Sequence, residues 1–280
     1  MYSKRPSAAA SIQGFSLVEL SIVVAIISVV ATLGLEVAAN FVNRTASNVS
    51  RERLKVVDEA TAAFFKIYGR LPCPANRTLP PENTNYGIED FTIAVISGTT
   101  VGGGVMAGAV PFRTINLPAI YSLDGFSSKF NYVVTRNQTS AGTGTAQFAN
   151  SANVAGIEVR TGVLEQPCST SKCQVLASPA SNAGAAYFIF SSGADQRGAV
   201  SARGVDLNVC ADWSFGPPTE TKVDAQNCVY GNATTKSYIR VGAGASTIPN
   251  NVFYDNRLNA GLNRSSYYDD VAIWRPRLQL

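Results

Sequence analysis

The chain has 280 residues, of which 15% are charged, and its formal net charge is +4. A charge this small gives no general electrostatic support for nucleic-acid binding, so no nucleic-acid partner is predicted. Histidine is absent from the sequence, which excludes Ser-His-Asp and Cys-His catalysis, histidine-containing zinc sites and HExxH hydrolysis. The sequence also lacks a P-loop and a dinucleotide-binding glycine motif, and we predict that the chain is not an enzyme.

The first predicted element is a long apolar helix. Residues Leu20 to Leu35 form a run of sixteen without a charge, and apolar flanks at 15–18 and 37–42 extend it. The run is about long enough to cross a bilayer as a helix. It is apolar on all sides, whereas a helix of a soluble core has one apolar stripe. The pattern therefore predicts a membrane-spanning helix.

The residues around the start of this run resemble the class III signal of type IV prepilins and pseudopilins. The residues that carry the resemblance are, in chain order, Lys4 and Arg5 in a leader without acids, Gly14, Phe15 and Glu19. The resemblance implies that prepilin peptidase cleaves between Gly14 and Phe15, removes the leader 1–14 and methylates the new amine of Phe15. The apolar segment then stays on the mature protein, whereas an ordinary secretory signal loses its apolar region.

Glu19 places a carboxylate within the apolar segment. An acid in the membrane costs roughly 2.5 to 3.5 kcal/mol, so it should have a partner or a function. In a staggered bundle of such helices, the amine of Phe15 in one subunit can approach Glu19 of a neighbour. At about 4 Å and an effective dielectric constant near 20, this pair is worth about 4 kcal/mol before desolvation, which favours one register of assembly. The alternative is an acid tolerated near the end of a plain membrane anchor.

An amphipathic helix is predicted to continue to about Tyr68. Apolar residues recur at near-helical spacing through Phe64 and Ile67, and Gly69 supplies a C-terminal stop. Counted from Phe15, the helix has 54 residues and a length of about 80 Å. Two prolines in the segment 70–75 then favour an extended chain. The motif Leu-Pro-Cys-Pro-Ala in this segment resembles one found in a subset of large bacterial pilin-like proteins.

The rest of the chain is predicted to be a β-rich head. The predicted strands are Phe91 to Ile96, Phe130 to Thr135, Gly156 to Arg160, Tyr187 to Ser191, Tyr238 to Val241 and Val271 to Trp274. The domains expected are a leader at 1–14, a transmembrane and amphipathic helix at 15–69, and a globular head at 70–280. The resemblance implies an α+β, pilin-like fold in which the long N-terminal helix packs on an enlarged antiparallel β-rich head.

The five cysteines all follow the apolar run, where an oxidising compartment would allow disulfides. They are Cys73, Cys168, Cys173, Cys210 and Cys228. The short spacing of Cys168 and Cys173 suggests one bridge, Cys210 and Cys228 would then form a second, and Cys73 would remain alone. Other pairings stay open, because sequence does not determine connectivity. No CxxC pair is present, and we predict no metal site through cysteine.

Calcium is the one cofactor that the resemblance raises. Some major pseudopilins bind calcium in a late loop, and here a turn-rich segment at 191–199 is followed by Asp206, Asp212 and Asp224. The acids lack the spacing of an EF-hand loop. Apart from this loop, no cofactor is predicted.

The resemblance implies a structural subunit of a type IV pilus or a type II secretion pseudopilus. Its expected partners are prepilin peptidase, other pilin or pseudopilin subunits and the inner membrane, which it would cross once, with its head in the periplasm or outside the cell. The large head favours a minor or tip-like subunit, because repeated packing along a filament leaves less room per subunit. Two alternatives stay open: an adhesin or ligand-binding head delivered on a pilin-like stem, and a membrane-anchored periplasmic enzyme.

Overall fold

The computed structural model confirms an α+β architecture with antiparallel sheet. It describes residues 17–93, 95–96, 104–139, 155–162, 173–179, 183–194, 196, 198–207, 229–232, 237–240, 252–254 and 271–276. Within these ranges it does not describe the side chains of residues 31–37, 39–40, 96, 162, 173–174, 229–232, 237–240, 252 and 254.

The first element, α1, is a helix of 52 residues, Leu17–Tyr68. It ends where the sequence predicts, because Gly69 has a φ of +64° and its N–H donates to the carbonyl of Phe65 at 2.8 Å. A left-handed residue at this position satisfies a carbonyl of the last turn. Lys66 lies in the same turn, where a positive charge complements the negative end of the helix dipole.

The chain divides into two compact units, residues 1–44 and residues 45–280, and α1 contributes to both. Within the described residues, which omit the side chains of 31–37, 39 and 40, no helical stretch has the length and apolarity needed to cross a membrane.

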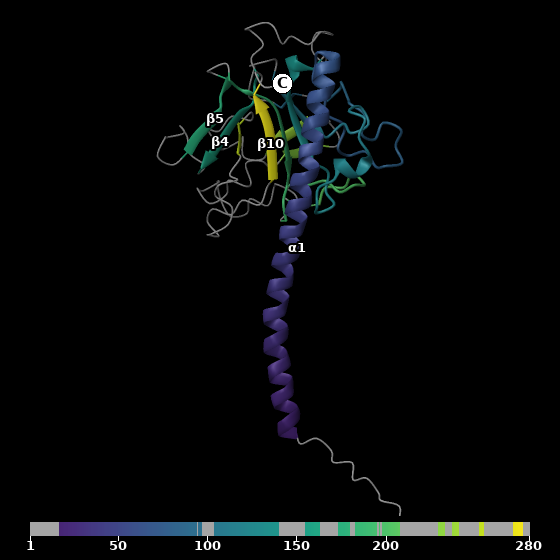
Figure 1. Ribbon diagram of the computed structural model, residues 1–280. Helices are drawn as coiled ribbons and strands as arrows, with labels where there is room; N and C mark the ends of the chain where they lie inside the picture. The colour runs from purple at the N-terminus through teal and green to yellow at the C-terminus, as the bar shows by residue number, and fades with distance from the viewer. Residues whose placement is uncertain are drawn as a thin grey trace, which may run out of the picture. The chain divides into compact units, whose positions relative to one another are not determined.

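The second unit is built around a five-stranded antiparallel sheet (Figure 1). Its strands, in spatial order, are β1 (Val95–Ile96), β2 (Val105–Ala109), β3 (Asn131–Thr135), β6 (Ala185–Ser191) and β10 (Val271–Pro276). In the middle of the sheet, Val133 pairs with Ala107 on one side and with Phe188 on the other. All seven residues of β6 are buried, which explains its nearly continuous apolar sequence.

Two smaller sheets complete the described strands. The first contains β5 (Cys173–Ala177), β4 (Glu158–Gly162) and β9 (Val252–Tyr254), of which β4 and β9 are parallel. The second is the antiparallel pair of β7 (Val229–Asn232) and β8 (Ser237–Arg240). Two short 3₁₀ helices, η2 (Ala119–Ser122) and η3 (Arg136–Gln138), flank β3 in the chain.

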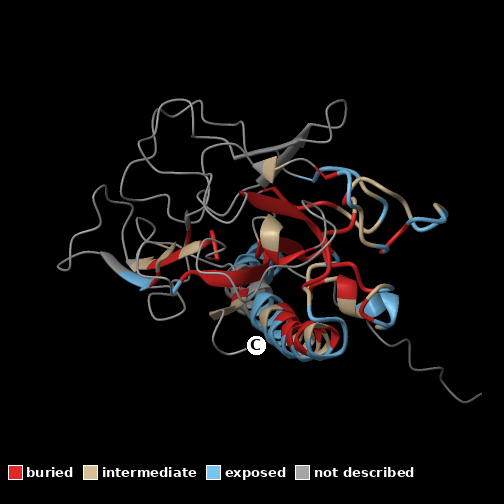
Figure 2. Ribbon diagram, turned by 90° about the horizontal axis from the view of Figure 1, so that it is seen from above, coloured by how far each residue is buried: buried red, intermediate tan, exposed pale blue. Residues whose placement is uncertain are grey.

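The second part of α1 belongs to the same hydrophobic core as the sheet. Leu54, Val57 and Phe64 are buried in it together with the apolar residues of β2, β3 and β6. The rings of Phe188 and Phe253 stack with their centroids 5.2 Å apart, which joins the core to β9. Buried residues, red in Figure 2, are concentrated in the middle strands. Burial of one stripe of α1 therefore fixes this part of the helix to the head.

The strand predicted to begin at Phe91 is wrong at its start. The described strand in this region is Val95–Ile96, and Phe91 and Thr92 form a turn. The physical reason is Asp90, whose Oδ1 accepts hydrogen bonds from the N–H and hydroxyl of Thr92 at 2.8 and 2.6 Å. This local side-chain bond competes with the extended conformation.

Candidate functional site

The first part of α1 presents an apolar surface with no cover from the described chain. Every large apolar residue between positions 17 and 30 is exposed, from 45% at Val23 to 84% at Leu17. These residues are Leu17, Val18, Leu20, Ile22, Val23, Val24, Ile26, Ile27, Val29 and Val30. Contiguous apolar surface of this extent marks a site of association with another apolar partner.

Glu19 is the one charged residue between positions 17 and 30. It is exposed and lies in the first turn of α1, where a negative charge interacts favourably with the helix dipole. Ser21 donates its hydroxyl hydrogen to the carbonyl of Val18 at 2.7 Å, and Ser28 donates to Val24 at 2.7 Å. Since the serine hydroxyls turn to their own helix, Glu19 is the main polar feature of this surface.

Gly14 and Phe15 lie outside the described residues, so cleavage between them and methylation of Phe15 stay predictions.

A buried ionic cluster joins α1 to the sheet. The carboxylate of Asp58, which is 6% exposed, accepts hydrogen bonds from Nε of Arg275 at 3.0 Å to each oxygen and from its Nη2 at 2.6 Å. The hydroxyl of Tyr187 donates to the same carboxylate. Burial and the charge of Asp58 raise the pKa of Tyr187, which keeps the phenol protonated as a donor. The cluster thereby connects α1 with β6 through Tyr187 and with β10, which is labelled beside α1 in Figure 1, through Arg275.

A second attachment of the head to α1 involves helix residues that precede Asp58. Arg53 donates from Nη1 to the carbonyls of Leu123 and Asp124 at 3.0 and 2.9 Å. The N–H of Gly125 donates to Oγ of Ser50 at 2.9 Å. A Cβ at Gly125 would lie 2.0 Å from the carbonyl oxygen of Ala46. The chain therefore approaches α1 so closely here that a side chain cannot be accommodated without a backbone shift.

Asp124 stabilises the loop that makes this contact. It is buried, and its Oδ1 accepts the N–H groups of Phe126 and Ser128 at 2.9 and 2.8 Å, while Oδ2 accepts the hydroxyl of Ser191 at 2.7 Å. Burial raises the pKa of this carboxyl group, and the three hydrogen bonds act in the opposite direction. The carboxylate thus has a structural role at the attachment of α1.

The structure locates only two of the five cysteines within described residues. Cys73 is buried as a free thiol after the end of α1, and its N–H donates to Glu89 at 3.0 Å. Burial raises the pKa of the Cys73 thiol to about 11, which disfavours the nucleophilic thiolate. Cys173 lies in β5. Cys168, Cys210 and Cys228 lie outside the described residues, so both disulfides remain predictions.

Of the three acids considered for calcium, only Asp206 is among the described residues. Asp206 has an oxygen 3.9 Å from Nη2 of Arg77, so a protein cation already lies beside it. Asp212 and Asp224 are outside the described residues. Among the residues that are described, no three His, Cys, Asp or Glu side chains gather into a metal-binding group.

Nothing in the sequence pattern indicates that Arg77 and Lys129 are buried. Arg77 is 2% exposed and donates to Oδ1 of Asn131 at 3.2 Å and to the carbonyl of Gly198. Lys129, 3% exposed, donates to the carbonyls of Arg77 and Leu79 at 2.8 and 2.7 Å. Burial lowers the pKa of Lys129 to about 8. Both cations therefore bind the loop after α1 to β3 and its surroundings.

Comparisons of this chain with protein-family models, with curated proteins and with solved structures found no match.

Proposed function

We propose that the chain is a structural subunit, minor or tip-like, of a type IV pilus or a type II secretion pseudopilus. It is delivered as a prepilin, cleaved between Gly14 and Phe15, methylated on Phe15 and held in the inner membrane by one pass until it joins the filament. The observation that carries the proposal is the contrast between the two parts of α1. The first exposes every large apolar side chain from 17 to 30, and the second buries one stripe of side chains in the core of a β-rich head.

This contrast supports an assembly function on physical grounds. At about 25 cal/mol per Å² of apolar surface removed from water, an uncovered apolar helix strongly favours lipid or other helices. Lipid alone would not favour an acid on such a helix. A neighbouring subunit supplies a partner, because the amine of its processed Phe15 can approach Glu19. The buried contacts of Asp58 and Arg53 attach the same helix to the head.

Processing is tested by mass spectrometry of the mature protein, made in a cell that has prepilin peptidase and a filament system. We expect an N-terminus at methylated Phe15. An intact Met1, or an N-terminus elsewhere, would refute the proposal.

Assembly is tested separately with Glu19→Ala and a matched control, Glu52→Ala. Glu52 is also an exposed acid of α1, but it lies in the head unit. We expect both variants to be processed, and only Glu19→Ala to be lost from sheared filament or pseudopilus fractions. Normal incorporation of Glu19→Ala would contradict the pairing between Phe15 and Glu19.

A further inference from the structure

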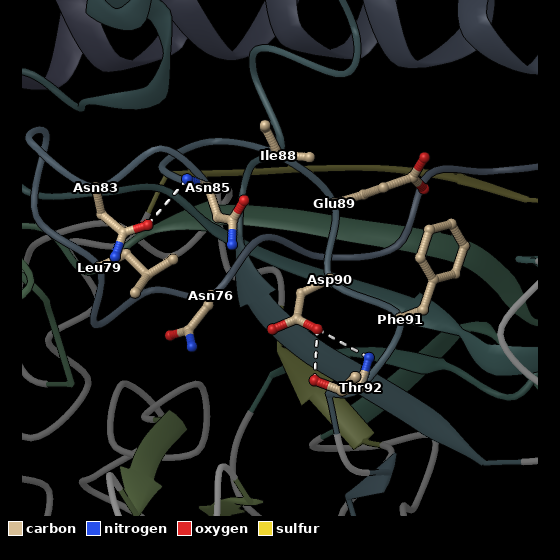
Figure 3. Close-up of a pocket in the computed structure, with 9 residues that line it drawn as sticks. All are labelled: Asn76, Leu79, Asn83, Asn85, Ile88, Glu89, Asp90, Phe91 and Thr92. Carbon is tan, nitrogen blue, oxygen red and sulfur yellow. Dashed lines mark hydrogen bonds between the residues drawn. The ribbon is translucent and has the colours of Figure 1, made fainter.

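A cavity of about 430 Å³ opens in the loop that follows α1 (Figure 3). All of its lining comes from one segment, and the residues are Asn76, Leu79, Asn83, Asn85, Ile88, Glu89, Asp90, Phe91 and Thr92. We call this cavity the Asx cleft, after its Asn and Asp side chains. Its volume falls within the roughly 300 to 1,000 Å³ of small-molecule sites.

The carboxamides of the Asx cleft are oriented by the chain itself. Oδ1 of Asn76 accepts from the N–H and hydroxyl of Thr78 at 3.0 and 2.8 Å, and Oδ1 of Asn83 accepts from the N–H of Asn85 at 2.9 Å. Because the backbone donors identify the oxygens, the Nδ2 groups are the ends left for a ligand. Within the described residues, neither these Nδ2 groups nor the Asn85 carboxamide has a hydrogen-bond partner. The cleft therefore offers oriented donors.

The charges around the cleft select against ionic ligands. Both oxygens of Glu89 accept from Arg70, at 2.7 and 2.8 Å, so this acid is neutralised by an ion pair. Asp90 uses Oδ1 for Thr92 and keeps Oδ2 as an acceptor. An anion would meet the negative charge of Asp90. Among the described residues of the lining, a cation would find two side-chain oxygens without a hydrogen bond, Oδ2 of Asp90 and Oδ1 of Asn85, whereas calcium takes 6 to 8 oxygen ligands.

The rim of the cleft is apolar and partly exposed. Phe91 is 49% exposed and Ile88 is 37% exposed. The guanidinium carbon of Arg70 lies 5.6 Å from the ring centroid of Phe91 and 5.1 Å from that of Phe64. This cation–π contact, together with the ion pair of Arg70 to Glu89, holds the Phe91 ring in place. The cleft therefore has an apolar ring at one side and amide donors at the other, with a carboxylate in the same lining, and this suits a ligand with a C–H face and a hydroxyl edge (Figure 3).

We propose that the Asx cleft binds a neutral saccharide. The Nδ2 groups of Asn76 and Asn83 donate to ring or hydroxyl oxygens, the Asn85 carboxamide donates and accepts, and Oδ2 of Asp90 accepts from a hydroxyl group. Phe91 packs against the C–H face of the sugar ring. The cleft lies entirely within the head unit, so this binding does not depend on filament assembly.

The test is saturation-transfer-difference NMR on the full chain, solubilised in a detergent without a sugar headgroup. The probes are the methyl glycosides of glucose, galactose, mannose and N-acetylglucosamine, with N-acetylneuraminic acid as the anionic comparison. The main variant is Asn83→Asp, which keeps the oxygen that accepts from Asn85 but replaces the Nδ2 donor. Its matched control is Asn48→Asp, the same change at an exposed asparagine of α1 outside the cleft. Asn85→Ala is the second variant, because that side chain is exposed.

We expect saturation transfer to at least one neutral glycoside. Asn83→Asp and Asn85→Ala should each weaken the affinity for that glycoside about tenfold, since each removes about one hydrogen bond. Asn48→Asp should bind as the wild type does. The proposal is overturned if the folded protein transfers saturation to none of the neutral glycosides, if both cleft variants bind like the control, or if N-acetylneuraminic acid binds as well as the neutral probes.

Discussion

The attachment of α1 to the sheet gives the sharpest stability prediction. Asp58→Ala removes the carboxylate that accepts hydrogen bonds from Arg275 and Tyr187. The Tyr187 side chain is fully buried, so its hydroxyl would lose its acceptor without access to water. The Arg275 side chain is 29% exposed, and water can replace part of what it loses.

The loss of unfolding free energy in Asp58→Ala can be estimated from the burial of Tyr187 and Arg275. A buried donor left without an acceptor costs about 1 to 3 kcal/mol. Removal of one partner of a fully buried ion pair costs about 3 to 5 kcal/mol, and the exposure of Arg275 places this pair below that range. Alanine has the higher helix propensity and returns roughly 0.5 kcal/mol. We expect Asp58→Ala to lower the free energy of unfolding by about 2 to 3 kcal/mol.

Urea unfolding followed by circular dichroism measures this change. Tyr187→Phe should cost only about 1 kcal/mol, because Asp58 keeps Arg275. The double variant should cost less than the sum of the two, since a phenyl ring needs no acceptor. Glu52→Ala, an exposed acid on the same helix, is the control and should change stability by less than about 0.5 kcal/mol. The reasoning is refuted if Asp58→Ala matches Glu52→Ala.

Three further predictions concern buried groups of the head. The pKa of Lys129 is lowered by burial from 10.5 to about 8, so the unfolded chain binds more protons between these values. The free energy of unfolding of the wild type should therefore rise relative to that of Lys129→Met as pH rises from 8 to 10.5, by up to about 3 kcal/mol. A difference in urea midpoint between the two proteins that stays constant over this pH range would contradict the prediction. Without reductant, peptide mapping after iodoacetamide treatment should find Cys73 modified only in denaturant, and rapid labelling of the native protein would show that the thiol is accessible. Gly125→Ala should destabilise the head by about 1 to 3 kcal/mol, because the new Cβ would clash with the backbone of Ala46. Gly69→Ala is the control: a Cβ there meets nothing within 4 Å, so the change should cost only the strain of a positive φ, about 1 kcal/mol. Equal effects of the two variants in the same urea assay would exclude the close approach of Gly125 to Ala46.

Local sequence signals predicted the elements that local physics determines. The helix stop at Gly69 follows from a single residue that adopts a positive φ. The strands at β3, β6 and β10 were predicted within a few residues, because their β-branched and aromatic runs are dense. Strand β2, Val105–Ala109, was missed, since its alanines and glycine have low strand propensity. It forms a strand because β3 pairs with its whole length.

The contacts between distant residues were beyond sequence reasoning. Asp58 and Arg275 are 217 positions apart, and nothing near either residue indicates the other. The ammonium group of Lys129 donates to two carbonyls of the loop after α1, and no residue near Lys129 in the sequence indicates this contact. The Asx cleft had a local signal in Asn76-Arg77-Thr78 and Asp90-Phe91-Thr92, where an Asn or Asp precedes a Thr by two positions. That signal predicts turns, but not that the turns surround one cavity.

The attachment of α1 has a consequence for how the head is completed. The carboxylate of Asp58 lies early in the chain, and its ionic partner Arg275 lies in β10, the last described strand, which pairs with β6 through six consecutive residues. Until β10 is in place, the carboxylate of Asp58 lacks the guanidinium of Arg275, which offsets the free-energy cost of burying its charge. A chain without β10 would therefore carry an acid on the face of α1 that should enter the core. Docking of residues 45–68 of α1 on the sheet thus favours chains in which β10 has already paired with β6.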